Sequence, residues 1–207
     1  MDAFPAESAA EGAFDAALKS ITIVRHGKPA LDRSVRMNAR RFITWWDEYD
    51  AGGLAEAGQK ISDELKAEGE HVAVIIASTL RRARETADVI ANGREVRFDE
   101  LFVEARLPPP MLPDFFCVKP GFWGVLARIS WWFGFHGDQE SRVEAEIRAE
   151  KGARKLIELA EANGSVMLVA HGWFNRMIRP VLLAHGWECV DDHGDTHWSY
   201  RRYEKRA

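Results

Sequence analysis

The stretch Ile21–Gly27 reads ITIVRHG and combines a strand pattern with polar residues directly after it. Its first four residues form an unbroken run of apolar and β-branched side chains. Such a run is typical of a strand buried on both faces, as in a parallel sheet covered by helices. An arginine, a histidine and a glycine follow that strand directly. Because ligands of open α/β sheets bind beyond the carboxyl ends of the strands, this stretch predicts both a sheet and the place of a site.

Two further runs of the same kind, Val72–Ala77 and Val166–Ala170, lie downstream. Each is short, nearly unbroken and rich in β-branched residues, so each predicts another buried strand. Helical patterns separate and follow these runs. We therefore predict an α/β fold, a three-layer α/β/α sandwich with a mostly parallel central sheet.

Apolar residues recur at spacings of three and four in four segments, which predicts four amphipathic helices. The first is expected to run along Leu54, Ala57, Ile61 and Leu65, with Gly69 as its C-cap. The other three are expected at residues 83–91, 139–162 and 173–184. In the helix at 139–162, Val143 and Ile147 are expected to face the core together with Ala153, Leu156 and Ala160.

The length of 207 residues favours a single domain, residues 1–207, with residues 1–19 as an N-terminal extension. Apolar residues make up 46% and charged residues 29%, which excludes disordered and fibrous classes. The formal net charge of −4 offers no basic excess, so we expect no nucleic-acid partner.

Several features predict a cytoplasmic protein without a membrane span. The two cysteines form no paired motif, as expected in a reducing compartment. The first residues are acidic where a signal peptide is basic. The longest aromatic-apolar stretch, Gly121–Phe135, contains Arg128 and is shorter than the ~20 residues that a membrane-spanning helix needs.

Residues 105–136 match neither the helical nor the strand period, and we interpret them as a long aromatic-rich insertion. Its rings, together with Trp45 and Trp46, have three interpretations. They form part of the core, they join two copies of the chain in a homodimer, or they form a lid over a substrate pocket. The lid is the sharpest of the three, because the insertion directly follows a candidate catalytic acid described below.

The three predicted strand ends carry residues suited to phosphate chemistry. Arg25-His26-Gly27 follows the first strand, the segment 78–84 with its three arginines follows the second, and His171-Gly172 follows the third. Guanidinium groups match pairs of phosphate oxygens and stay charged at working pH. A neutral imidazole can attack phosphorus and form a covalent phosphohistidine. A carboxylic acid is then needed to protonate the leaving alcohol.

The motifs IVRHG, STLRRARETA and LVAHG, in this order, resemble those of the histidine phosphatase superfamily, in particular its phosphoglycerate mutase-like branch. The resemblance extends from about Ile21 to about Ile178, and the segments LAEAGQKIS and GDQES support it. It implies a phosphatase of the histidine acid phosphatase type that hydrolyses phosphomonoesters through a phosphohistidine. It implies a small phosphorylated substrate and no metal or other cofactor.

The resemblance also implies roles for individual residues. His26 matches the phosphorylated nucleophile, and Arg25 matches the phosphate ligand beside it. Arg82 occupies the arginine of the pattern S-x-L-x-R-A-x-x-T. His171 matches the second histidine, which holds the phosphoryl group.

The catalytic acid is implied at Glu104, with Glu100 as its competitor. Lys28 and Arg81 are candidate substrate-binding residues. The chain departs from the family pattern after RHG, where Lys28-Pro29 adds a positive charge, and at residues 105–113, which lack the usual glycine-rich stretch. The second departure leaves a catalytically silent phosphate-binding module open as an alternative. A phosphomutase of the same family is the other alternative, although 207 residues with a 32-residue insertion leave little of the extra sequence that the mutases carry.

Two further groups receive plainer interpretations. His193 and His197 lie four residues apart among acidic residues, but Gly194 interrupts any helix there, so we expect no metal site. The tail at 201–206 is expected to be a solubilising terminus.

Overall fold

The computed structural model describes residues 18–205. Residues 1–17, which make up most of the expected N-terminal extension, and residues 206–207 lie outside this range. The elements in chain order are β1 (Lys19–Arg25), α1 (Ala39–Ala51), α2 (Asp63–His71), β2 (Val74–Ala77), α3 (Arg81–Ala91), β3 (Val96–Phe98), a 3₁₀ turn (Glu100–Phe102), α4 (Pro120–Trp132), α5 (Arg142–Asn163), β4 (Ser165–Ala170), α6 (Gly172–Ala184), β5 (Glu188–Asp192) and β6 (Tyr200–Lys205). Between residues 18 and 205 no helix combines the length and the apolar character needed to cross a bilayer.

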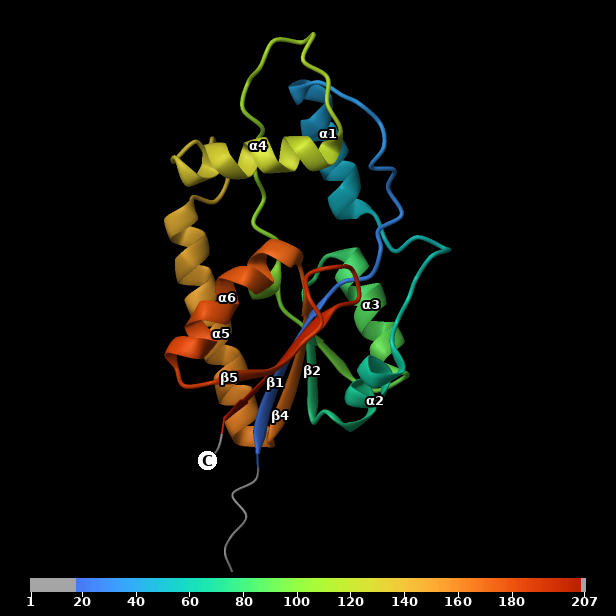
Figure 1. Cartoon of the computed structure of the whole chain (residues 1–207), viewed down its shortest axis with the longest axis vertical. Coiled ribbons are helices and arrows are strands. Elements are labelled where there is room, and N and C mark those ends of the chain that lie inside the picture. Colours follow the sequence, from blue (N-terminus) through green and yellow to red (C-terminus); the bar gives the residue numbers. More distant parts are fainter. Residues whose placement is uncertain (1–17, 206–207) are drawn as a thin grey trace, which may run out of the picture.

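The six strands form one sheet in the order β3-β2-β4-β1-β6-β5. The strands β3, β2, β4 and β1 are mutually parallel, and β6 runs antiparallel to both of its neighbours. Helices α5 and α6 cover one face of the sheet, and α2 and α3 cover the other (Figure 1). The predicted three-layer sandwich with a mostly parallel sheet is confirmed.

The strands have unbroken apolar runs because helices cover both faces of the sheet. Ile21 and Ile23 of β1 pack into the core beneath α5 and α6, whereas Val24 packs into the core beneath α2 and α3. Alternate side chains of one strand thus enter two different cores. Every position in the run is therefore either apolar or a polar side chain whose hydrogen bonds are made within the protein. The buried hydroxyl of Thr22 donates to Glu68 of α2 at 2.7 Å, which shows how the one polar position of the run 21–24 is accommodated.

The prediction of a helix along residues 54–65 is wrong. The helix α2 begins only after Ser62, whose hydroxyl accepts from the Leu65 amide at 3.2 Å. Upstream of it, Leu54 forms a bridge with Pro29, and Gly58 adopts a left-handed φ of 78° that a helix cannot accommodate. Gly69 is not the C-cap; it lies inside α2.

The three other predicted helices correspond to α3, α5 and α6. In α5, however, Val143 and Ile147 point outward, with 58% and 52% of their surface exposed. The buried stripe consists instead of small residues and one leucine: Ala145, Ala149, Gly152, Ala153, Leu156 and Ala160. Small side chains let α5 approach the sheet and α6 closely, and Gly152 lies against the ring of Phe102.

A second substructure, which we call the cap, lies beyond the carboxyl ends of the parallel strands (Figure 1). It consists of α1, α4 and the segments 28–38 and 105–119 that lead into them. The predicted insertion is therefore not irregular throughout, because it contains α4. The rings of Phe42 in α1 and Trp123 in α4 stack at 5.9 Å, and the Trp123 indole donates to the Met37 carbonyl at 2.7 Å.

Helix α1 was absent from the sequence prediction, although its signal is present. Phe42, Trp45 and Tyr49 recur at spacings of three and four, and Asn38 caps the helix by accepting from the Arg41 amide at 3.0 Å. The tail prediction is also wrong, because residues 201–205 belong to β6, which pairs with β1. Arg206, the last residue of that predicted tail, lies outside the described residues.

Candidate active site

The two histidines that follow β1 and β4 lie side by side. These strands are neighbours, with Arg25 paired to Ala170, so the residues after them emerge at one point of the sheet edge. The ring centroids of His26 and His171 are 5.2 Å apart, and both side chains are buried. The convergence predicted from the strand ends is therefore present.

The two ring nitrogens of His26 have different neighbours. The Nδ1 atom lies 2.8 Å from the Gly27 carbonyl, which can only accept, so Nδ1 carries the proton. The Nε2 atom is then an acceptor, and it receives a long hydrogen bond of 3.4 Å from Nε of Arg82. Burial, and next the charge of Arg82, hold the pKa of His26 well below its usual 6.5. His26 is thus a neutral imidazole with its lone pair on Nε2.

Arg82 is fully buried at the start of α3, and the C-terminal end of α1 holds it. Its Nη1 atom donates to the Tyr49 carbonyl at 3.0 Å, and both Nη atoms donate to Asp50 at 3.2 Å. The guanidinium also lies over the Tyr49 ring, 4.4 Å from its centroid. Burial raises the pKa of Asp50, although Arg82 acts in the opposite direction. The cap therefore contacts the predicted phosphate ligand directly.

His171 and Arg25 each have a buried nitrogen that lacks a hydrogen-bond partner among residues 18–205. The Nε2 atom of His171 lies 2.8 Å from the Ser78 hydroxyl, whereas its Nδ1 has no hydrogen-bond partner within residues 18–205. Burial lowers the pKa of His171 well below 6.5, with the Arg82 charge as the next cause. Arg25 donates from Nη1 to the Asp195 carbonyl, and its buried Nε is likewise unpartnered in that range.

Glu104 lies at the N-terminus of α6. One carboxylate oxygen accepts from the Phe174 amide at 3.0 Å, and the other accepts from the Trp173 amide at 3.1 Å. These amides belong to the first turn of a helix, where they lack partners within the helix. Glu100, the competing candidate, is exposed on the 3₁₀ turn. The geometry places Glu104, and not Glu100, at the site.

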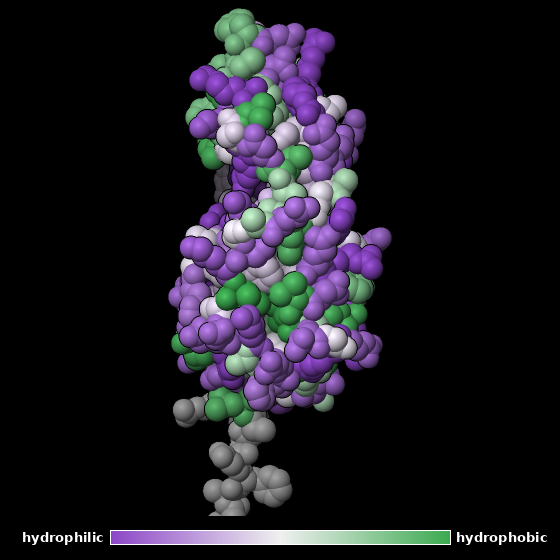
Figure 2. Space-filling model, turned by 90° about the vertical axis from the view of Figure 1, so that its right-hand side faces the viewer, coloured by the Kyte–Doolittle hydropathy of each residue, from purple (hydrophilic) through white to green (hydrophobic). Residues whose placement is uncertain are grey.

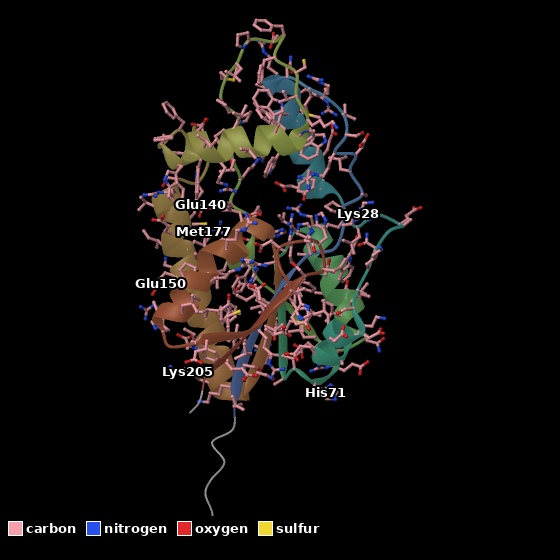
Figure 3. The ribbon with its side chains drawn as sticks, in the orientation of Figure 1. Lys28, His71, Glu140, Glu150, Met177 and Lys205 are labelled. Carbon is pink, nitrogen blue, oxygen red and sulfur yellow. The ribbon has the colours of Figure 1, made fainter. Side chains whose placement is uncertain are left out.

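A cavity of about 130 Å³ lies between these residues and the cap. In Figure 3, side-chain nitrogen atoms gather in this region, below α1 and α4. The sheet side of the cavity is lined by Arg25, His26, Arg82, Glu104 and Gly172. The cap side is lined by Arg33, Trp45, Trp46, Tyr49, Pro120, Gly121 and Gly124.

Comparison with known proteins shows the family of this chain. The family model of the histidine phosphatase superfamily (branch 1) matches residues 21–206. The chain belongs to the histidine phosphatase superfamily. The family match includes β5 and β6, beyond the end of the motifs noted in the sequence.

Solved structures of other proteins share the fold of this superfamily member. A mycobacterial glucosyl-3-phosphoglycerate phosphatase is 23% identical with a TM-score of 0.52, over 81% of this chain and 80% of that chain. An Entamoeba histolytica phosphoserine phosphatase mutant in complex with phosphoserine is 16% identical with a TM-score of 0.53, over 91% of this chain and 94% of that chain. No curated protein matches the sequence.

Three predicted site residues of this superfamily member are not among those that line the cavity, and of these only His171 lies next to His26. Arg81 is exposed on α3 and pairs with Glu85, one turn along the helix, at 2.7 Å. Lys28 does not line the cavity either; it is exposed on the segment that leaves β1, at the edge of the site region in Figure 3. Exposed cations on a helix face or a loop are commonly solvated, and Arg81 follows that pattern.

The GDQES segment, which supports the family resemblance, has a structural part in this chain. Ser141 and Glu144 form a capping box that starts α5. Glu140 pairs with Arg148 at 2.6 Å, and Arg148 donates to the Val103 carbonyl at 2.8 Å. Figure 3 shows Glu140 where α4 meets α5. The segment thus holds the backbone directly before Glu104.

One residue near His26 was not predicted as a site residue from the sequence. His197, between β5 and β6, has its ring centroid 5.5 Å from that of His26. The sequence signal was weak, because the tail was not recognised as a strand that pairs with β1. Within residues 18–205, no three His, Cys, Asp or Glu side chains gather as a metal site.

Proposed function

We propose that this protein hydrolyses phosphomonoesters through a covalent phosphohistidine at His26, without a metal ion. The observation that carries the proposal is the state of His26, a buried neutral ring with its proton on Nδ1 and its lone pair on Nε2 beside a guanidinium. A nucleophile of this kind needs an unprotonated, oriented nitrogen, and the Gly27 carbonyl and Arg82 orient it.

In the first step, Nε2 of His26 attacks phosphorus, and the bond from phosphorus to the alcohol oxygen breaks. Glu104, in its acid form, donates a proton to the leaving oxygen. In the second step, water attacks the phosphohistidine, its proton returns to Glu104, and the bond between nitrogen and phosphorus breaks. Inorganic phosphate leaves and His26 regains its lone pair.

Arg25, Arg82 and His171 hold the phosphoryl group in both steps. The two guanidinium groups offset the negative charge on the phosphoryl oxygens, and donors fixed in a buried site require little reorganisation during the reaction. The unpartnered buried nitrogens of Arg25 and His171 support this role, because buried polar atoms are normally hydrogen-bonded.

The substrate is a small phosphorylated molecule whose alcohol part lies against the cap. The cavity is small, and its cap side consists of three aromatic residues together with Arg33, Pro120 and the glycines of α4. We further propose that α1 and α4 act as a lid over this part of the substrate.

Turnover of p-nitrophenyl phosphate, with and without a chelator, tests the proposal. We expect turnover that survives chelation, is abolished in His26→Ala and is unchanged in His71→Ala, a control at an exposed histidine. Loss of activity on chelation would contradict the metal-free mechanism. Binding of phosphate without any turnover would instead support the silent module.

A further inference from the structure

The loop between β5 and β6 brings His197 to the nucleophile. Because β6 runs antiparallel to β1, the residues before β6 lie beside the residues after β1. The Arg25 amide donates to the Ser199 carbonyl at 2.9 Å, and the Trp198 amide donates to the Arg25 carbonyl at 3.2 Å. His197 therefore lies next to His26, with ring centroids 5.5 Å apart.

The backbone beside His197 is held in an unusual conformation. Trp198 adopts a left-handed φ of 66°, which costs energy for any residue with a side chain. Its indole packs against Gly27, where a Cβ would come within 2.5 Å of the ring, and Nε1 donates to Gln59 at 2.6 Å. The surrounding structure thus enforces the turn that sets the direction of His197.

A network of ion pairs fixes the same loop from the other side. The Asp195 carboxylate pairs with Arg176, Arg179 and Arg201 at 3.2, 2.5 and 2.7 Å, and the Asp195 carbonyl accepts from Arg25. The loop is therefore attached to the predicted phosphate ligand itself. A rigid loop of this kind can present a side chain to a reacting group without reorganisation.

The chemistry of His197 suits a hydrogen-bond donor. Burial, and next the charge of Arg25, lower the pKa of His197 to about 4, so the ring is neutral at physiological pH. Its Nε2 atom is buried and has no hydrogen-bond partner among residues 18–205. His193, in the same loop, is exposed and paired with Asp191 at 2.9 Å.

We propose that His197 is a third histidine of the active site, which donates a hydrogen bond from Nε2 to an oxygen of the phosphoryl group. The inference rests on the function proposed above and adds a ligand on the side of His26 that the β5–β6 loop covers. The hydrogen bond requires no proton transfer, because the ring keeps its proton on Nε2 throughout. Nothing in the RHG, arginine or LVAHG motifs predicts this residue.

Two substitutions distinguish a donor from a packing residue. His197→Gln keeps an N–H donor of similar reach, whereas His197→Phe keeps the ring and loses the donor. The probes are p-nitrophenyl phosphate for kcat and KM, and orthovanadate for the inhibition constant. His193→Gln and His193→Phe are the matched controls, and thermal unfolding verifies that each variant folds.

We expect His197→Phe to lower kcat/KM on the order of 10²-fold, as for the loss of one donor to a developing charge, and to weaken vanadate inhibition. His197→Gln should recover most of both, and the His193 variants should stay within about twofold of the parent protein, as surface changes away from a site do. Equal behaviour of Gln and Phe at position 197, or better retention by Phe, would overturn the inference. Turnover that persists in His26→Ala would instead overturn the proposed function, whatever the His197 variants do.

Discussion

His26 carries the proposed chemistry because its two ring nitrogens have different neighbours. Nδ1 keeps its proton and donates it in a hydrogen bond to the Gly27 carbonyl, whereas Nε2 accepts only a long hydrogen bond from Arg82. Burial keeps the ring neutral. His171 is neutral for the same reason, although the Ser78 hydroxyl, and not a carbonyl, contacts its ring.

The two buried rings make stability depend on pH. Burial holds the pKa of His26 and of His171 well below 6.5, whereas in the unfolded chain both titrate near that value. As the pH falls through 6.5, the unfolded state takes up protons that the folded state does not, so the free energy of unfolding decreases. We expect a loss of roughly 1 kcal/mol for each ring between about pH 7 and pH 5.5.

Urea unfolding at several pH values measures this loss. Substitution of His26 by Asn should reduce the slope, because one titrating ring is then absent. A free energy of unfolding that stays constant or rises as the pH falls from about 7 to 5.5 would contradict the prediction.

Glu104→Gln should remove the acid and keep most of the shape of the site. Protonation matters most for a poor leaving group, so hydrolysis of an alkyl phosphate should fall on the order of 10²- to 10⁴-fold. Hydrolysis of p-nitrophenyl phosphate, whose leaving group needs little protonation, should fall much less. The ratio of kcat/KM for the two substrates is the measurement, and Glu100→Gln is the control. The same ratio in both variants would reject Glu104 as the acid.

Helix α4 has three different sides, and each side corresponds to one of the three interpretations of the aromatic insertion. Trp123 and Trp131 are buried in the core of the cap and beneath it. Gly121 and Gly124 line the cavity. A third side, with Phe122, Val125, Ile129 and Trp132, is about half exposed. Core packing and the lining of the cavity are thus features of the structure, whereas lid motion and dimer contact are proposals.

A larger side chain in place of Gly124 should narrow the cavity without disturbing the fold. A Cβ built at this position meets no heavy atom within 4 Å. Gly124→Ala should stabilise α4 by about 0.5–1 kcal/mol, because glycine is unfavourable inside a helix. Gly124→Leu should lower kcat/KM for naphthyl phosphate more than for p-nitrophenyl phosphate. Val125→Leu, on the exposed side of α4, is the control. An equal loss of kcat/KM for both esters would contradict the proposal that α4 covers the alcohol part of the substrate.

Helix α1 contributes the partners of Arg82, and Asp50→Asn should reveal their importance. The variant leaves a buried guanidinium without its countercharge, and we expect a loss of roughly 1.5–3 kcal/mol in the free energy of unfolding. Added inorganic phosphate should restore part of this loss, because the anion supplies the missing charge. Asp47→Asn, at an exposed pair with Arg106, should cost less than about 1 kcal/mol. Equal stability of the two variants would show that Asp50 does not hold Arg82.

At the scale of the whole molecule, the site lies where two substructures meet. The sheet side supplies the candidate phosphate ligands, and the cap supplies the aromatic wall and the partners of Arg82. In Figure 2 hydrophilic residues prevail over much of the visible face, and hydrophobic residues gather at the far end of the cap. Met111 and Phe115, in the segment that forms this end, are 71% and 86% exposed.

A second copy of the chain should cover the exposed side of α4. A helix that is apolar on all sides is usually buried, and an apolar patch can pair with its own copy in a symmetric dimer. We expect sedimentation to show a homodimer and Ile129→Lys to yield monomers. Val190→Lys, at an exposed apolar position on β5, should leave the dimer intact. A parent protein that is monomeric at all concentrations would exclude this contact.

Three strands of the sheet and the candidate phosphate-binding residues at their ends can be predicted from the sequence alone. The runs 21–24, 72–77 and 166–170 are apolar because helices cover both of their faces. This pattern can be recognised in the sequence alone. Parallel strands end at one edge, so the sequence places His26 and His171 at the same edge, and the pairing of β1 with β4 then makes them neighbours.

The surroundings of those residues depend on the tertiary packing. Asp50 reaches Arg82, and His197 reaches His26, through the packing of α1 and the register of β6. Neither contact has a local signal, because both depend on the pairing of segments that are remote along the chain. Local periodicity reports which face of an element is buried, but it does not report which distant element buries it.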